Sequence, residues 1–146
     1  MKKIRIVLAE DDEDDRLFFK EAINQLDLNT EIKFVADGDE LLKYLNDPES
    51  HFPDLVFLDL NMPRKGGIQS LSEIRASQKL TGLSVAIYST SSSDEDIENC
   101  FIGGANVYIK KPNNIESLKS VLFKVITTNH QYINSTMNKD NFLMVV

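Results

Sequence analysis

Short apolar runs alternate with segments of helical periodicity along most of the chain, and no other feature constrains the possible folds as strongly. The runs of strand length are residues 4–9, 31–35, 54–58, 83–88 and 107–109. Between them, apolar residues recur at helical spacing, as in Phe19, Ala22, Ile23 and Leu26. Because parallel strands need crossover connections of helix length, the alternation predicts a parallel sheet joined by helices.

The expected fold class is α/β, with an open, doubly wound five-stranded parallel sheet of flavodoxin-like order 2-1-3-4-5 and helices on both faces. A closed eight-stranded barrel of about 250 residues does not fit into 146 residues. Residues 31–35 alternate between polar and apolar, which is typical of an edge strand. Residues 4–9 are mostly apolar, as a strand buried on both faces would be.

Charge and composition exclude several classes of function. Sixteen Lys and Arg against 23 Asp and Glu give a formal net charge of −7, which disfavours direct binding to nucleic acid. The single cysteine, Cys100, cannot form an internal disulfide, and no apolar stretch approaches the roughly 20 residues of a membrane span. The first apolar run is also too short for a signal peptide. We therefore expect a cytoplasmic protein with no membrane partner.

Chemically complementary side chains stand where the predicted strands end. Glu10 and Asp11 follow the first strand, Asp59 the third, Ser89 the fourth and Lys111 the fifth. In open α/β sheets the ligand site lies beyond the carboxyl ends of the strands, beside the point where strand order reverses. Like charges 4 Å apart repel by about 4 kcal/mol at an effective dielectric constant of about 20. A divalent cation and Lys111 would balance the three carboxylates, and Mg²⁺ suits such hard oxygen ligands. An aspartate in that setting can accept a phosphoryl group.

The two carboxylates after the first strand, Glu10 and Asp11, belong to an acidic run, EDDEDD, at residues 10–15. Asp12 is interpreted as the cap of the following helix. Glu13, Asp14 and Asp15 are interpreted as solvated or capping acids of its first turn, which the helix dipole favours. The metal-binding pair is expected to be Glu10 and Asp11, with a shift of one residue to Asp12 as the alternative.

Four motifs stand in order along the chain: VLAEDD at residues 7–12, LDLNMPRKGG at 58–67, YST at 88–90 and GANVYIKKP at 104–112. They resemble the motifs of a known family, the receiver domains of two-component response regulators, whose fold is that of the chemotaxis regulator. The resemblance covers residues 4 to about 127. One motif alone is weak, but the four in this order and spacing are specific.

The resemblance implies roles for several residues. Asp59 would be the phosphoacceptor and would receive the phosphoryl group from the phosphohistidine of a histidine kinase. Glu10, Asp11 and Asp59 would hold Mg²⁺ together with the backbone carbonyl of Asn61. Lys111 would contact the transferred group. The protein would assist its own phosphorylation and dephosphorylation rather than act as an enzyme on other substrates.

A conformational switch is implied as well. Ser89 occupies the switch hydroxyl position and Tyr108 the switch aromatic position of the family. Phosphorylation would draw the loop after the fourth strand inward and change a protein-binding face formed by the fourth helix, fifth strand and fifth helix. A cis peptide bond between Lys111 and Pro112 is also implied.

The leading interpretation is therefore a stand-alone response regulator of a two-component phosphorelay. Its partners would be a histidine kinase or phosphotransfer protein and a downstream protein target. One alternative is a Mg²⁺-dependent phosphohydrolase with an Asp nucleophile, although such enzymes use a second Asp two residues later, where this chain has Asn61. Another alternative is a binding scaffold that is not phosphorylated.

The expected domain organisation is a receiver domain over residues 1–128 and a C-terminal extension over residues 129–146. The extension is polar and rich in turn-forming residues, then ends in the β-favouring sequence FLMVV. We expect it to pack on its own domain or on a dimer mate, with disorder as the alternative. A homodimer is thus a possible assembly.

Overall fold

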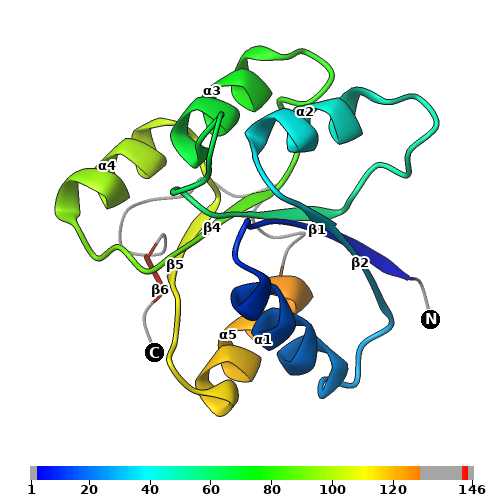
Figure 1. Ribbon diagram of the computed structural model, residues 1–146, viewed down its shortest axis with the longest axis vertical. Coiled ribbons are helices and arrows are strands. Elements are labelled where there is room, and N and C mark those ends of the chain that lie inside the picture. Colours follow the sequence, from blue (N-terminus) through cyan, green and yellow to red (C-terminus); the bar gives the residue numbers. More distant parts are fainter. Residues whose placement is uncertain (1–2, 129–142, 145–146) are drawn as a thin grey trace.

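A parallel sheet with strand order β2-β1-β3-β4-β5-β6 runs through the middle of the molecule (Figure 1). The structure is a computed structural model and describes residues 3–128 and 143–144. Within these residues the strands are β1 (Ile4–Ala9), β2 (Thr30–Val35), β3 (Leu55–Leu58), β4 (Val85–Ser89), β5 (Val107–Lys110) and β6 (Leu143–Met144). The predicted order 2-1-3-4-5 is confirmed, with strand bounds that differ by one or two residues.

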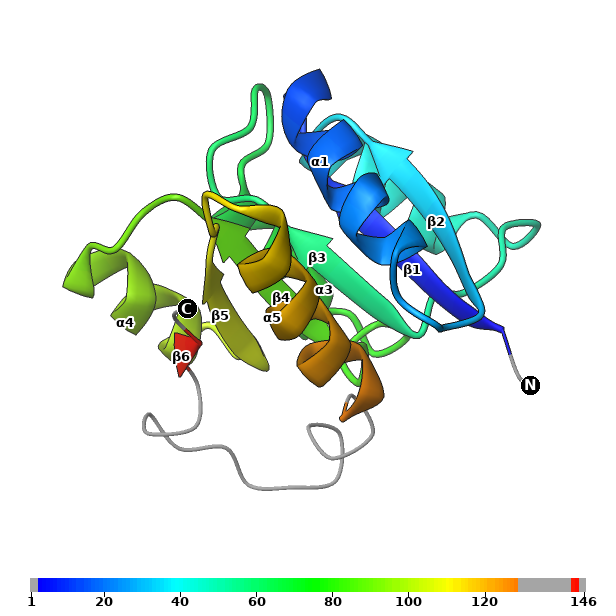
Figure 2. The same ribbon diagram turned by 90° about the horizontal axis from the view of Figure 1, so that it is seen from below.

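Helices cover both faces of the sheet, with α2, α3 and α4 on one side and α1 and α5 on the other (Figures 1 and 2). The helices are α1 (Glu13–Asn24), α2 (Gly38–Asn46), α3 (Gly67–Ala76), α4 (Asp94–Ile102) and α5 (Ile115–Thr127). None of these helices has the length and apolar character needed to traverse a bilayer. The α/β fold class is therefore as predicted.

Two hydrophobic cores, one on each face, explain why the central strands are almost wholly apolar. Alternate residues of a strand point to opposite faces. On β1, Ile6 and Leu8 lie in the core beneath α1 and α5, whereas Val7 and Ala9 lie in the core beneath α2, α3 and α4. All four are at most 1% exposed, so no position in this stretch tolerates a polar side chain without loss of burial.

Side-chain caps fix where α1, α2, α4 and α5 begin. Asp12 accepts a hydrogen bond from the Asp15 backbone N–H and caps α1, as predicted. Asp37 caps α2 by accepting a hydrogen bond from the Glu40 backbone N–H. An aspartate suits this position because its carboxylate accepts a hydrogen bond from an N–H group that has no partner within the helix. At its other end α1 stops at Asn24.

The last described element, β6, pairs with the outer edge of β5. The pairing is parallel, with Tyr108 opposite Leu143 and Ile109 opposite Met144. This part of the extension therefore continues the sheet of its own chain. The predictions for residues 129–142 and 145–146, including a dimer contact, fall outside the described residues.

Phe57 is a sensitive test of the packing between the sheet and α1. Its ring is fully buried and lies edge-on to that of Phe19, with 5.0 Å between ring centroids. We expect Phe57→Ala to lower the free energy of unfolding by about 3–5 kcal/mol, because a large cavity replaces the ring. Urea denaturation measures this loss. The matched control is Phe123→Ala, since Phe123 is 48% exposed, and equal losses in both variants would contradict the assigned packing.

Candidate functional site

Backbone pairing brings the ends of four strands together at one edge of the sheet. The Asp59 N–H donates to the carbonyl of Ala9 at 3.0 Å, which places the residues after β1 and β3 side by side. The Lys111 N–H donates to the carbonyl of Ser89 at 2.8 Å and does the same for β4 and β5. The sheet register thus gathers the residues that the sequence pattern selected.

Glu10, Asp11 and Asp59 form an acidic triad at this edge. Each contributes a carboxylate oxygen that lies within 4.8 Å of the other two. Glu10 is 1% exposed and Asp59 is 6% exposed, whereas Asp11 is open to solvent. Two buried carboxylates and an exposed one, so close together, form a strongly negative pocket with one open side.

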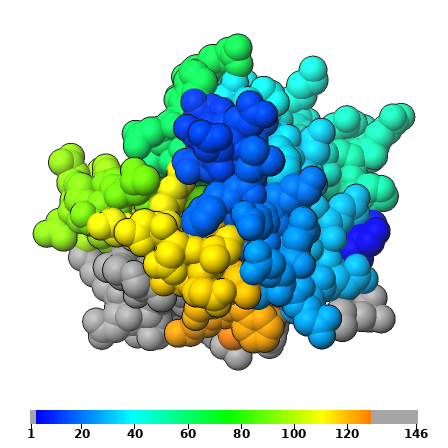
Figure 3. Space-filling view, turned by 60° about the horizontal axis from the view of Figure 1, so that its bottom comes forward, coloured from blue at the N-terminus to red at the C-terminus, as the bar shows by residue number. Residues whose placement is uncertain are grey.

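Lys111 is the cation that the structure places against this triad. Its ammonium lies 2.5 Å from Glu10 Oε1 and 3.7 Å from Asp59 Oδ2, and its side chain is only 8% exposed. The ammonium also lies 5.2 Å from the centroid of the Tyr88 ring. Figure 3 shows this part of the surface, where the blue segment at the start of α1 borders the yellow segment that follows β5.

Asp15 also pairs with Lys111, at 2.9 Å between Oδ2 and Nζ. The interpretation of Asp15 as a merely solvated or capping acid is therefore wrong. It stands in the first turn of α1, as expected, but that turn lies over the end of β1 and faces the loop after β5. The position of the run EDDEDD gave a weak indication of this contact. Because the helix begins directly after β1, its first turn lies close to the carboxyl end of that strand, where the acidic triad lies.

Burial and like charge act together on Glu10. Burial raises the pKa of its carboxyl to about 7, with the negative charge of Asp59 adding to the effect and Lys111 opposing it. Burial alone would lower the pKa of Lys111, but its hydrogen bonds to Glu10 and Asp15 and the charge of Asp59 raise it overall. The ammonium therefore stays charged, and the pocket favours additional positive charge.

A second group of residues links Ser89 to Tyr108. Both are fully buried. The Ser91 N–H donates to Ser89 Oγ at 3.1 Å, and the Tyr108 hydroxyl donates to the Ser91 carbonyl at 2.9 Å. The Ser91 hydroxyl in turn donates to Asp96 at the start of α4, at 2.6 Å. The loop between β4 and α4 is thus hydrogen-bonded both to the strand end and to β5.

The loop between β3 and α3 is held where it meets α3 and in its middle. A Cβ added at Gly67 would lie 2.4 Å from the Asp59 carbonyl oxygen, so this close approach requires glycine. In the middle of the loop, Arg64 forms an ion pair with Asp37, which is buried at the start of α2. The hydrogen bond from the Glu40 N–H, followed by that from Arg64, lowers the pKa of Asp37. These contacts fix the loop that carries Asn61, whose N–H lies 3.4 Å from Asp59 Oδ1.

Comparison with known proteins identifies the family. A model described as the response regulator receiver domain matches residues 6–123. The chain belongs to this family. The receiver domain is 31% identical over 123 residues to "Probable methanogenesis regulatory protein FilR2" of Methanothrix harundinacea, which covers 82% of this chain and 79% of the relative. It is 28% identical to response regulator Rcp1 of Synechocystis, over 77% of this chain and 80% of Rcp1. The crystal structure of the phosphorylated cyanobacterial phytochrome response regulator RcpA superposes with a TM-score of 0.81 at 29% identity, over 92% of this chain and 98% of RcpA.

The acidic triad is typical of the divalent metal site of receiver domains. The residues present fit a hard cation, because all three donors are carboxylates and their oxygens lie within one coordination sphere of each other. Positive charge there would also oppose the burial and the negative charge of Asp59 that raise the pKa of Glu10.

One expectation drawn from the family is wrong. The bond between Lys111 and Pro112 is not cis, since the described residues contain no cis peptide bond. The trans form is the ordinary one, and it is favoured by about 0.5–1 kcal/mol even before proline.

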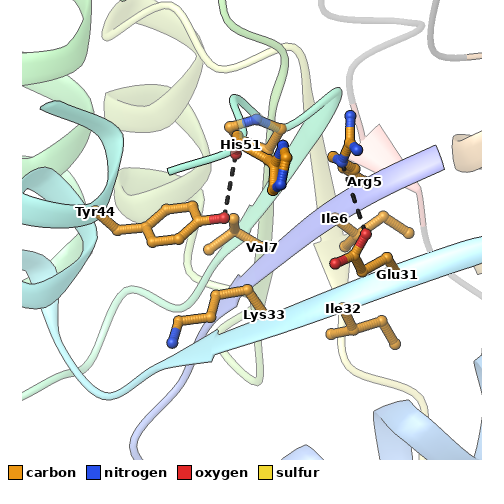
Figure 4. A pocket seen from close by; sticks show the side chains of 9 residues that line it. Arg5, Ile6, Val7, Glu31, Ile32, Lys33, Tyr44 and His51 are labelled. Atoms are coloured by element: carbon orange, nitrogen blue, oxygen red, sulfur yellow. Dashed lines mark hydrogen bonds and ion pairs between the residues drawn. The ribbon is translucent and has the colours of Figure 1, made fainter. Parts of the chain in front are cut away.

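A small cavity lies elsewhere on the receiver domain, near the amino ends of β1 and β2 (Figure 4). Its volume is about 120 Å³. Arg5 and Glu31 face one another across it at 3.6 Å, and the Tyr44 hydroxyl donates to the carbonyl of His51 at 3.1 Å. These polar groups partner each other, and the cavity is remote from the strand ends that carry the triad. We do not include it in the candidate site.

The exposed member of the triad allows a direct test of cation binding. We expect Asp11→Asn to weaken the binding of Mg²⁺ or Mn²⁺ by at least about tenfold, because it removes a charged ligand. Isothermal titration calorimetry measures the dissociation constant. Glu13→Gln is the matched control, since Glu13 is an exposed acid of the neighbouring helical turn and lies outside the triad. Equal weakening in both variants would show that net charge, not ligation, governs binding.

Proposed function

We propose that this receiver domain is the phosphoacceptor of a two-component phosphorelay, with Asp59 as the residue that is phosphorylated. The observation that carries the proposal is the position of Asp59. At the carboxyl edge of the sheet it lies close to the carboxylates of Glu10 and Asp11 and to the Lys111 ammonium. The phosphoryl donor is the phosphohistidine of a histidine kinase or of a phosphotransfer protein. A downstream protein reads the change.

The transfer needs a nucleophile, an open approach and positive charge. A carboxylate oxygen of Asp59 forms a bond to phosphorus while the bond between phosphorus and the imidazole nitrogen breaks, and the imidazole keeps that electron pair. Lys111 is positioned to donate a hydrogen bond to a phosphoryl oxygen, since its ammonium is 3.7 Å from the Asp59 carboxylate. When bound, Mg²⁺ supplies charge that offsets the negative phosphoryl oxygens. Glu10, Asp11, Asp59 and the backbone carbonyl of Asn61 would hold the ion.

The switch follows from the hydrogen bonds of the loop between β4 and α4. The Ser89 hydroxyl rotates to donate to the new phosphoryl group, and the loop shifts with it because Ser91 is bonded to Ser89. Tyr108 is bonded to the same Ser91, so the shift is passed to β5. The face that responds comprises α4, β5 and α5, with β6 beside β5. This arrangement favours a binding switch over a phosphohydrolase, in which a second acid would occupy the position of Asn61.

Phosphorylation is tested by incubating the protein with Mg²⁺ and acetyl phosphate and then measuring the intact mass. We expect an adduct of about 80 Da that is stable in acid and labile in base, as an acyl phosphate is. Asp59→Ala removes the acceptor and should gain no adduct. An adduct on that variant would refute the assignment of Asp59, and sustained turnover of unrelated phosphate esters by the unmodified chain would favour a hydrolase.

A further inference from the structure

The ion pair between Asp15 and Lys111 has no part in the function proposed above. It nevertheless involves the same Lys111 ammonium that lies near Asp59. Asp15 stands on the rim of the pocket with its side chain 40% exposed, while Lys111 is buried. The two atoms are 2.9 Å apart, at hydrogen-bonding distance. Asp15, which lies outside the acidic triad, is thus in direct contact with the Lys111 ammonium.

The geometry shows how the ammonium is shared. A lysine ammonium has three hydrogens to donate. Glu10 and Asp15 accept two of them, at 2.5 Å and 2.9 Å, and the Asp59 carboxylate lies farther off at 3.7 Å. Lys111 is therefore held on the side of the pocket formed by β1 and α1.

We propose that Asp15 is a positioning residue of the phosphoacceptor site, which restrains Lys111 and opposes the accumulation of negative charge on Asp59. The inference rests on the proposed function of Asp59. Two effects act in the same direction. Asp15 competes with the phosphoryl group for the ammonium, and its own negative charge repels that group. Asp15 thus lowers the fraction of the protein that is phosphorylated.

The neighbouring acid Asp14 supplies a matched control. It belongs to the same helical turn and is exposed, and it forms no ion pair with another described residue. Replacing either residue by asparagine removes one negative charge from the first turn of α1. The ion pair with Lys111 is lost only when Asp15 is replaced.

The first measurement is the ratio of phosphorylated to unphosphorylated protein at a limiting concentration of acetyl phosphate with Mg²⁺, read from intact mass. We expect Asp15→Asn to raise this ratio by about threefold to fivefold, the factor that a half-exposed ion pair supplies. Asp14→Asn should leave it unchanged, and Asp15→Glu, which keeps the charge, should restore the original ratio. Asp15→Ala is the second neutral variant, and circular dichroism verifies that each variant is folded.

The second measurement is the ¹⁵N resonance of the Lys111 ammonium, which needs no phosphorylation. It should shift in Asp15→Asn and stay in place in Asp14→Asn. The inference is overturned if the resonance does not move, or if Asp15→Asn and Asp14→Asn give the same phosphorylated ratio. Should the unmodified chain gain no adduct while the resonance does shift, the proposed function fails and the positioning of Lys111 by Asp15 stands.

Discussion

The contact between the buried ammonium of Lys111 and the carboxylates around it is the interaction on which the rest of the site depends. Glu10, Asp11, Asp15 and Asp59 with Lys111 sum to −3 when all are ionised. Bringing so many acids together costs several kcal/mol for each close pair, even at an effective dielectric constant of about 20. Lys111 reduces this cost at the deepest point, beside Glu10, but burial and the charge of Asp59 still raise the pKa of Glu10 to about 7. The remaining imbalance is what makes the pocket a place for a divalent cation.

The sheet makes such a concentration of charge possible, because its own stability does not come from the site. Burial on both faces anchors β1 and β3, so their carboxyl ends stay in register although the residues that follow repel one another. The loop after β3 is anchored separately, by the close approach at Gly67 and by the pair of Arg64 with Asp37. Stability is thus supplied by the cores and the anchors, and the strand ends are free to carry unfavourable but reactive groups.

The sequence was informative wherever one physical rule decides the outcome. Burial on two faces demands continuous apolar runs, so the strands, their order and the positions of Glu10, Asp59 and Lys111 at their ends could all be predicted. It was less informative where two rules compete for the same residue. Acids in a first helical turn are already explained by the helix dipole, so the place of the run beside the first strand was too weak a sign to single out Asp15 as a partner of Lys111. Likewise, Asp37 before a glycine fits a turn as well as a helix cap, and only the position of α2 decides between them.

Within the described residues, a chain of contacts also runs from the carboxyl end of β4 to the outermost strand, β6. Ser89 ends β4, Ser91 is bonded both to it and to Tyr108, and Tyr108 lies opposite Leu143 of β6. Each link is a hydrogen bond or a strand pairing rather than a loose contact, so a displacement at Ser89 cannot be absorbed within the loop alone. Tyr108 is fully buried, which leaves its ring little room to respond except by moving with β5 or out of the core. Under the proposed function, the paired edge formed by β5 and β6 is the part of the surface that we expect to respond when Asp59 is phosphorylated.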